Sequence, residues 1–464
     1  MKKKAKVLLA VAIVALLSLG SFSTLAHAAV DPALPVSEAG ITKVLHVPVN
    51  TEYPAMEFEF YIELISEDGG SPSASMPVPT GATNVSGDIY SYSLFFDGWA
   101  VWDATPLLAA EDYDSIGSTG PDEYYFVESG DMFGTLTYPH AGIYEYEITE
   151  HDVIYTAAGG NVTETDTLSL AAYTLWVYVA ECGQTTCTHG PGNTAIHASQ
   201  TDLYITHIGV VQTIKDDGTP GDDEKKLDPI PGGDQTNYFW SQVAFENGYV
   251  KTNGSITPDP DDAGLVISKE VDGAYGSTTK YFEFELELSV STLIWDGSTP
   301  PAPIYEAIVV EWDSSIPDWV DVTDTDNGAS AAGVPIDFVC GTPTTFYLKH
   351  GQYLIFKEIP VGTGFEVTED STSSSGYDAI IDVTINGTTI AASPFGAVGS
   401  PAWTPGQLYT GEAGNVAAYT NDASSITPTG INMTALPLIG LLGLFVLGFL
   451  GYRLIAKKAK GQKS

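Results

Sequence analysis

A two-residue alternation of apolar and polar side chains runs through most of this chain, from Ala29 to Asn421. Runs rich in Val, Ile, Thr, Tyr and Phe are separated by clusters of Gly, Pro, Asp and Ser, and no long stretch repeats every 3.6 residues. Successive side chains of a β-strand point to opposite faces of its sheet, so this pattern is typical of strands with one buried face. The sequence therefore predicts an all-β protein with sandwich-like sheets.

The length of 464 residues favours at least two domains, and the composition changes at one place in particular. Gly248–Asp262 contains Asn-Gly and the run Pro-Asp-Pro-Asp-Asp, which is the chemistry of turns and linkers. The segments on either side show the same order of elements, which indicates a divergent internal repeat. We expect domains at residues 29–250 and 263–425, joined by a linker at 251–262.

The start of the chain has the three parts of a secretory signal peptide. Four early lysines are followed by the apolar run Val7–Leu19 and then by the small-x-small sequence Ala26-His27-Ala28. We expect residues 1–28 to be this signal peptide. The rest of the chain is then exported from the cytoplasm.

The apolar stretch at residues 435–455 is long enough to span a bilayer, and the basic tail at 456–464 is expected to stay in the cytoplasm. Residues 426–430, just before the stretch, read Ile-Thr-Pro-Thr-Gly. This order resembles the cell-wall sorting signal of Gram-positive surface proteins, although the family pattern Leu-Pro-x-Thr-Gly has its proline one place earlier. The resemblance implies that a sortase cleaves between Thr429 and Gly430. A membrane anchor that is never cleaved is the alternative.

The charge of the exported part limits the choice of partners. Lys and Arg total 18, and Asp and Glu total 59. All of the acids, but only nine lysines and no arginine, lie between Ala29 and Thr429, which gives that region a net charge of −50. So acidic a surface repels nucleic acid and anionic membranes and suits a solvated extracellular protein. We therefore expect no nucleic-acid partner.

The sequence gives no reason to expect a cofactor or a metal. The acidic runs at 215–224 and 324–328 lack the full spacing of a calcium loop and are interpreted as exposed turns. No nucleophile elbow, histidine cluster or phosphate loop is present, so an enzyme with turnover is not expected. Of the three cysteines, Cys182 and Cys187 are close enough to bridge a hairpin, which leaves Cys340 over.

Two predicted strands carry a glutamate on their apolar face. In Gly142–Glu150, the last residue lies in phase with two tyrosines and an isoleucine. In Gly364–Glu369, it lies in phase with a phenylalanine and a valine. A lone buried carboxylate costs several kcal/mol unless it is paired or protonated. Glu150 and Glu369 therefore need a chemical reason to face the core.

Each unit also places a lysine and an asparagine on apolar strand faces. Lys43 and Lys269 alternate with aliphatic residues on the opening strands, and Asn247 and Asn421 lie in phase with aromatic residues on the closing strands. Burial favours a neutral, nucleophilic amine and a neutral acid that can polarise an amide. Held at attack distance, the amine can displace ammonia from the asparagine. The predicted product is a Lys–Asn isopeptide bond, formed once and without turnover.

The order of these residues resembles the pilin isopeptide-linkage domains of Gram-positive surface proteins. The shared motifs are Lys, Phe-x-Phe, Gly-x-Tyr-x-Tyr-x-Ile-x-Glu and Phe-x-Asn. The second unit is similar to a sister variety, with Phe-x-Leu-Lys-His-Gly at 346–351 and Ile-Pro-x-Gly at 359–362. The resemblance implies two tandem Ig-like, Cna-B-like β-sandwich domains. It also implies one bond from Lys43 to Asn247 assisted by Glu150, and another from Lys269 to Asn421 assisted by Glu369.

Together these features predict a structural cell-surface or cell-wall protein, either a pilin or a pilin-like stalk subunit. Its expected partners are a sortase, neighbouring pilin subunits or peptidoglycan, and the membrane that holds the C-terminal helix before processing. Polymerisation requires an exposed lysine, for which Lys251, Lys225 and Lys226 are the candidates. The alternative is a wall- or membrane-anchored adhesin that binds a host or partner-cell ligand through the insertion at 182–234.

Overall fold

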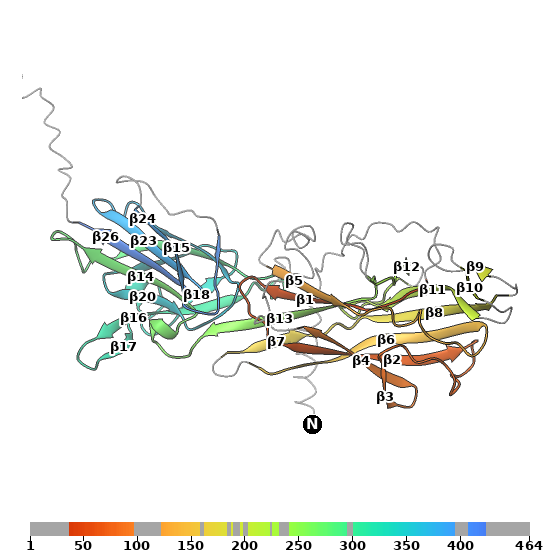
Figure 1. Ribbon diagram of the computed structural model, residues 1–464. Helices are drawn as coiled ribbons and strands as arrows, with labels where there is room; N and C mark the ends of the chain where they lie inside the picture. The colour runs from red at the N-terminus through yellow and green to blue at the C-terminus, as the bar shows by residue number, and fades with distance from the viewer. Residues whose placement is uncertain are drawn as a thin grey trace, which may run out of the picture.

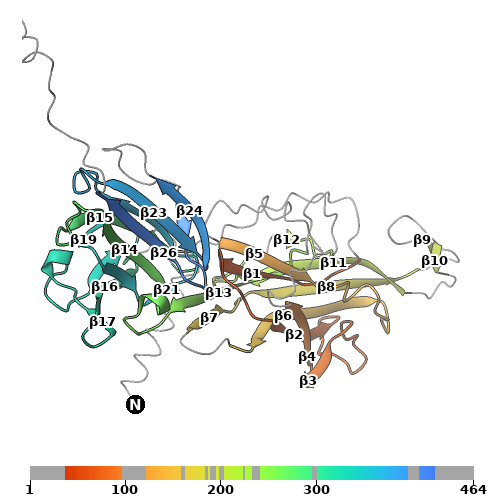
Figure 2. The same cartoon turned by 60° about the vertical axis from the view of Figure 1, so that its left-hand side comes forward.

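Strands dominate the part of the chain that the computed structural model describes. The described residues are 37–96, 122–157, 162–182, 187–188, 195–197, 203–222, 225–231, 241–294, 300–394 and 407–423. The helical elements among them are two single 3-10 turns, η3 (Pro260–Asp262) and η4 (Thr325–Asn327). The strands form stacked sheets in two units that lie end to end (Figures 1 and 2). The prediction of an all-β, sandwich-type protein is confirmed.

The predicted elements at the two ends of the chain lie outside the described residues. They are the signal peptide at 1–28, the sorting motif at 426–430, the apolar span at 435–455 and the basic tail at 456–464. Where the structure is described, no helix has the length and apolarity needed to cross a bilayer.

The first unit packs two sheets against each other around an aromatic core. One sheet has the order β12-β11-β8-β6-β2-β4-β3, and the other contains β13-β1-β5 with β7 also paired to β13. The strands of these sheets are β1 (Thr42–Pro48), β2 (Met56–Glu67), β3 (Thr83–Ser86), β4 (Ile89–Phe96), β5 (Asp122–Glu128), β6 (Gly142–Tyr155), β7 (Glu164–Thr167), β8 (Ala172–Glu181), β11 (Leu203–Ile214), β12 (Lys226–Leu227) and β13 (Ala244–Gly254). A small separate sheet pairs β9 (Cys187–Thr188) with β10 (Ala195–His197).

The second unit repeats this plan with shorter connections. One sheet has the order β17-β16-β20-β14-β26-β23-β24 with β18 also paired to β16, and the other has the order β19-β15-β22-β25. The strands are β14 (Leu265–Asp272), β15 (Phe282–Ser289), β16 (Ile304–Asp313), β17 (Asp318–Asp321), β18 (Ile336–Val339), β19 (Thr344–Leu348), β20 (Gln352–Phe356), β22 (Gly364–Glu369), β23 (Asp378–Ile385), β24 (Thr388–Pro394), β25 (Leu408–Tyr409) and β26 (Val416–Asp422).

In both units the opening and closing strands are neighbours and run parallel. In the β1–β13 pair, Lys43 lies opposite Phe245, and Asn247 lies two positions further along, opposite Leu45. The β14–β26 pair has the same offset, since Lys269 lies opposite Tyr419 and Asn421 is again two positions further along. Residues two apart on a strand share a face, so each pair directs its lysine and asparagine into the same core.

Strand β6 follows the predicted alternation up to Glu150 and then changes phase. Tyr144 is fully buried whereas Ile143 is 41% exposed. In the pairing with β2, Phe60 lies opposite Glu150 and Glu59 lies opposite Asp152, so His151 is an extra, bulged residue. The His151 ring stacks on Tyr61 at a centroid distance of 3.7 Å. The bulge thus marks the end of the regular face that carries Glu150.

The junction between the units is built from strands. We expected a linker at 251–262, but β13 continues through Gly254 and pairs with β21 (Glu358–Pro360) of the second unit. Gly254 has a φ of +109°, and a Cβ there would lie 1.9 Å from the carbonyl oxygen of Lys357. The glycine of the Asn-Gly pair therefore permits the close approach of the Lys357 backbone to β13. A linker segment begins only after this glycine.

Two asparagine side chains fasten the same junction. Asn50 Nδ2 donates to the Tyr409 carbonyl at 3.1 Å, and Asn253 Nδ2 donates to the Gly411 carbonyl at 2.8 Å. Both donors belong to the first unit, and the two carbonyls belong to the end of β25 and to the segment that follows it in the second unit. The units are therefore joined by side-chain hydrogen bonds as well as by the β13–β21 strand pair.

Candidate crosslinking sites

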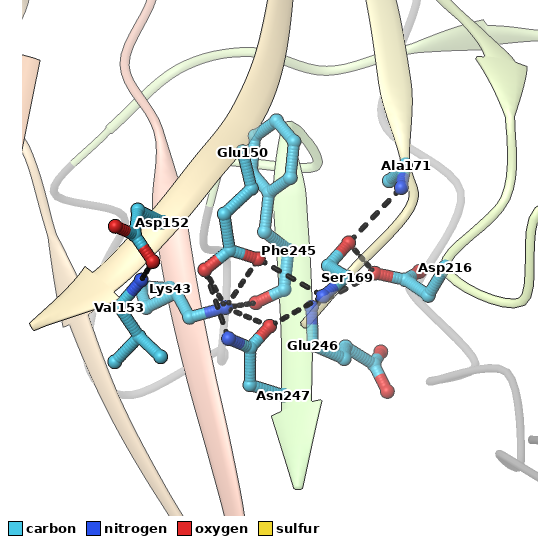
Figure 3. A network of polar contacts seen from close by, with 10 residues as sticks. All are labelled: Lys43, Glu150, Asp152, Val153, Ser169, Ala171, Asp216, Phe245, Glu246 and Asn247. Carbon is cyan, nitrogen blue, oxygen red and sulfur yellow. Dashed lines mark hydrogen bonds and ion pairs between the residues drawn. The ribbon is translucent and has the colours of Figure 1, made fainter. Parts of the chain in front are cut away.

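In the first unit, three strands bring Lys43, Glu150 and Asn247 together. Lys43 comes from β1, Glu150 from the end of the regular part of β6, and Asn247 from β13, and Figure 3 shows the three side chains converging. The Lys43 Nζ atom lies 3.0 Å and 3.1 Å from the two carboxylate oxygens of Glu150. It also donates to Asn247 Oδ1 and, at 3.2 Å, to the Phe245 carbonyl.

The amide of Asn247 closes this arrangement into a ring of contacts. Its Nδ2 atom donates to Glu150 Oε1 at 2.9 Å, so the carboxylate contacts both the amine and the amide nitrogen (Figure 3). The side chains of Lys43 and Glu150 are fully buried, and Asn247 is 1% exposed. The Phe58 ring lies 4.7 Å from the Lys43 Nζ atom. The amine therefore faces an aromatic wall, a carboxylate and an amide, and is shielded from water.

Burial lowers the pKa of Lys43, because desolvation penalises the charged ammonium. The neighbouring Glu150 acts in the opposite direction through its charge and its hydrogen bond, but desolvation is the larger effect. The site therefore makes the neutral amine more accessible than it is in water. A neutral amine has the free electron pair that a nucleophile needs.

A loop residue that the sequence did not single out completes the first site. The backbone N–H of Ser169 points at Asn247 Oδ1, 2.8 Å away, and at Glu150 Oε2, 3.0 Å away (Figure 3). The Ser169 hydroxyl in turn donates to Asp216 Oδ1 at 2.6 Å. The run at 215–224 was interpreted as an exposed turn, but the Asp216 carboxylate points inward because it accepts hydrogen bonds from the segments that flank the site.

The second unit brings Lys269, Glu369 and Asn421 together from β14, β22 and β26. The Lys269 Nζ atom lies 3.0 Å and 3.1 Å from the two oxygens of Glu369, and Asn421 Nδ2 donates to Glu369 Oε1 at 2.6 Å. Lys269 and Asn421 are fully buried and Glu369 is 6% exposed. The Phe282 ring lies 4.5 Å from the lysine nitrogen. The carboxylate again lies between the amine and the amide.

In the second site, as in the first, burial lowers the pKa of the lysine. Burial lowers the pKa of Lys269 to about 8, opposed by the Glu369 charge and supported by nearby Lys280. Burial also raises the pKa of Glu369, and the positive charge of Lys269 opposes that shift. A lowered amine pKa and a raised acid pKa bring the ion pair and the neutral pair closer in free energy. One proton moved within the pair then gives a neutral amine and a neutral acid.

The remaining predicted residues are placed as follows. Cys182 is disulfide-bonded, and Cys340 is a buried free thiol. The side chain of Cys187 and residues Thr429 and Gly430 lie outside what the structure describes.

The structure separates the three candidate lysines for polymerisation. Lys225 and Lys226 are exposed. Lys251 was expected to be exposed, and this is wrong, because only 8% of it is accessible and its Nζ atom contacts Glu412 Oε2 at 2.5 Å. It lies at the junction, where the loop that carries Glu412 covers it. The exposed candidates are therefore Lys225 and Lys226.

Comparisons with known proteins identify one matching family and several distant structures. The family described as "Domain of unknown function (DUF7601)" matches residues 263–394. No curated protein matches the chain. Among solved structures, the major pilin of Streptococcus pyogenes is 16% identical, with a TM-score of 0.28 over 84% of this chain and 99% of the pilin.

Two further structures are similar at the same low level. The S. pyogenes major pilin T3.2 is 15% identical, with a TM-score of 0.27 over 83% of this chain and 98% of the pilin. A pilus-presented adhesin is 12% identical, with a TM-score of 0.21 over 65% of this chain and 93% of the adhesin. Likenesses this weak carry no argument about function, which has to come from the buried side chains themselves.

Proposed function

We propose that the chain is a pilin or pilin-like structural protein of the cell surface whose two units each mature by a Lys–Asn crosslink. The observation that carries the proposal is the double occurrence of one arrangement. A lysine, a glutamate and an asparagine are buried together at the same offset on a parallel pair of opening and closing strands. Three polar groups buried in an apolar core are costly, and finding them twice favours a chemical purpose over chance.

The proposed reaction balances without any further reactant. The neutral amine of Lys43 attacks Cγ of Asn247, so a C–N bond forms and the carbonyl oxygen gains negative charge. The bond from Cγ to Nδ2 then breaks, and a proton from the amine goes to Nδ2 through Glu150, whose carboxylate contacts both nitrogens. The products are one amide and one ammonia. Lys269, Glu369 and Asn421 follow the same steps, and each site reacts once, so the chain is not a turnover enzyme.

Such crosslinks suit a protein under tension. A pull on the two ends of the chain would pass from Lys43 directly to Asn247, along β13, and then from Lys269 directly to Asn421. The residues between each lysine and its asparagine would lie outside this covalent path and carry little load. Unlike a disulfide, an amide is not broken by reducing agents. This matches an acidic, exported chain with only three cysteines.

The mass of the intact, folded protein tests the crosslinks. Two bonds leave the mass short by two ammonia molecules, and Asn247→Ala or Asn421→Ala should each abolish the loss from its own unit. A crosslinked peptide pair that joins Lys43 to Asn247 after proteolysis would identify the first bond. A folded wild-type chain with its full mass would show that the two triads are merely buried ion pairs.

Attachment to the surface is the second part of the proposal. We infer that a sortase cleaves between Thr429 and Gly430 and links the chain to peptidoglycan or to a lysine of the next subunit, for which Lys225 and Lys226 are the exposed candidates. A ladder of high-mass species in cell-wall extracts, lost in a Lys225→Ala, Lys226→Ala double variant, is the expected result. A single band would instead indicate a singly anchored protein such as an adhesin, and an intact C-terminal tail would exclude cleavage.

A further inference from the structure

One backbone N–H in the first site does not take part in a sheet and points at the reacting atoms. It belongs to Ser169, in the short segment between β7 and β8, and it lies 2.8 Å from Asn247 Oδ1. In the proposed reaction this oxygen gains negative charge as the amine attacks. A donor fixed in advance on such an oxygen stabilises the transition state more than the ground state.

The Ser169 segment is held in place by Asp216. The carboxylate oxygen Oδ1 of Asp216 accepts the Ser169 hydroxyl at 2.6 Å and the Glu246 backbone N–H at 2.8 Å. Its backbone carbonyl accepts the Leu170 N–H at 3.0 Å. Glu246 directly precedes Asn247 on β13. Asp216 therefore ties the segment that carries the donor to the strand that carries the acceptor (Figure 3).

The charge state of Asp216 is compatible with this role. Burial, with a smaller contribution from the charge of Glu246, raises its pKa to about 6. At neutral pH the group is thus mainly ionised and accepts both hydrogen bonds as a charged acceptor, which makes them shorter and stronger than neutral ones. A second contact supports the geometry, since the Ala171 N–H donates to the Ser169 hydroxyl at 3.1 Å.

The second site has no corresponding donor in the described part of the chain. Asn421 Oδ1 is buried and has no hydrogen-bond partner there. Among the described residues, the two triads therefore differ at the amide oxygen, which accepts from the Ser169 N–H and from Lys43 Nζ in the first site and from neither a backbone N–H nor Lys269 in the second. The glutamate contacts the amine and the amide nitrogen in the same way in both.

Resting on the proposed crosslinking, we infer that the Ser169 N–H acts as an oxyanion donor in the first unit and that Asp216 is the residue that positions it. The second unit reacts without such a donor. Removing one donor from an oxyanion site typically slows a reaction by about 10²–10³. A variant that only loosens the donor should have a smaller effect, and we expect Asp216→Ala to slow the first crosslink by at least about tenfold.

The test compares the rate of ammonia loss in the first unit with the rate in the second unit of the same molecule, which serves as an internal reference. Full-length chain is recovered unfolded in denaturant and refolded by dilution, and ammonia loss is followed separately for the two units by peptide mass spectrometry. Asp216→Ala should slow the first unit relative to the second. Asp216→Asn, which keeps an acceptor oxygen for the Ser169 hydroxyl and the Glu246 N–H, should restore most of the rate. Ser169→Ala, which keeps the N–H but loses the tie to Asp216, should resemble Asp216→Ala.

The matched control is Asp217→Ala. Asp217 belongs to the same turn but bonds Thr219 and not Ser169, so it reports disruption of the turn alone. Thermal denaturation in a Lys43→Ala background, where the first bond cannot form, measures any loss of stability separately. An unchanged first-unit rate in a folded Asp216→Ala chain overturns the inference. Loss of no ammonia from either unit of the wild-type chain overturns the proposed function itself.

Discussion

The two proposed crosslinking sites each contain a lysine, a glutamate and an asparagine and differ in what surrounds these side chains. In the first, Glu150 and Asn247 are 97 residues apart, and the intervening segment returns Ser169 and Asp216 to the site. In the second, Glu369 and Asn421 are only 52 residues apart, and Asn421 Oδ1 has no partner among the described residues. The comparison separates a minimal set, the lysine, glutamate and asparagine side chains found in both units, from an additional layer of contacts. This layer consists of Ser169 and Asp216 and is found in the first unit.

The minimal set follows directly from strand geometry. A parallel pair of end strands with the same two-residue offset aligns the lysine and the asparagine in both units, and a central strand of the opposite sheet supplies the glutamate. The additional layer depends on a loop and a turn. What the two units teach is that the sandwich alone can assemble the reactants, whereas their fine positioning is left to the connections.

The largest expected effect comes from the glutamates, which are common to both sites. Glu150→Gln and Glu369→Gln keep the size of the side chain and one acceptor oxygen, but they remove the second acceptor oxygen and the ionisable proton carrier. We expect each to slow ammonia loss in its own unit by about 10²–10⁴, the usual contribution of general acid–base catalysis. The same refolding and peptide-mass measurement follows it.

The controls for this prediction are Glu147→Gln on β6 and Glu366→Gln on β22, whose side chains point to the other face of their strands. Neither should change the rate in its unit. A Glu369→Gln chain that crosslinks at the wild-type rate would mean that proximity alone drives the second site, and the parallel between the two sites would then fail.

A second prediction concerns stability and should be nearly equal for the two units. Asn247→Ala and Asn421→Ala remove the bond but leave the Lys–Glu pair in place. In the chain-entropy treatment of a crosslink, loops of this length are each worth on the order of 5 kcal/mol, because the dependence on loop length is logarithmic. Denaturant unfolding, with each domain followed by its own proteolytic fragments, measures the two losses. A loss several-fold larger in one unit would show that strain or packing, and not loop closure, dominates there.

A third prediction concerns pH and uses the lowered pKa of Lys269 in the second site. Just below pH 8 the unreacted Lys269–Glu369 pair holds one proton, which is what the reactive combination of a neutral amine and a neutral acid requires. Because the pKa of Lys269 is about 8, the pair loses that proton above pH 8 and the acid can no longer donate. The rate of ammonia loss on refolding should therefore fall about tenfold per pH unit above pH 8. A rate that instead keeps rising above pH 8 would mean that the free amine suffices.

The same shift has a defined effect on the stability of the unreacted form. The pKa of Lys269 in the folded chain lies below its ordinary value of 10.5, so between pH 8 and 10.5 the unfolded chain binds more protons than the folded one. Stability of the unreacted second unit then rises with pH across that window. Asn421→Ala, which cannot react, is the chain in which to measure it, with Asn247→Ala as the matched variant of the first unit.

Much of the minimal set could be predicted from the sequence, because the alternation of apolar and polar residues shows which side chains share the buried face of a strand. That pattern directed Glu150, Glu369 and the two lysines to the cores. It could not reveal Ser169, since its contribution is a backbone N–H whose direction depends on loop geometry. It also placed Asp216 in an exposed turn, because a run of acids looks solvated when its distant hydrogen-bond donors are not known.

Three further features of the structure depend on long-range contacts that the alternation of residues does not show. Lys251 was expected at the surface, but its partner Glu412 lies 161 residues further along the chain. The linker was expected to begin at residue 251 because Asn253-Gly254 is turn chemistry, yet β21 pairs with this segment and keeps it in a strand. The bulge at His151 is likewise invisible in the alternation, since it is defined by the pairing with β2.

Strand β13 has a consequence for the stiffness of the whole molecule. It holds Asn247 near its start, and five residues after that, at Thr252, it begins to pair with β21 of the second unit. One continuous strand is thus part of both units, and its residues Lys251 and Asn253 contact Glu412 and Gly411 of the second unit. Because this strand belongs to both sheets, we expect a rotation of one sandwich to turn the other with it and the two units to resist twisting as one body. In a fibre of such subunits, bending and twisting would concentrate at the contacts between successive molecules.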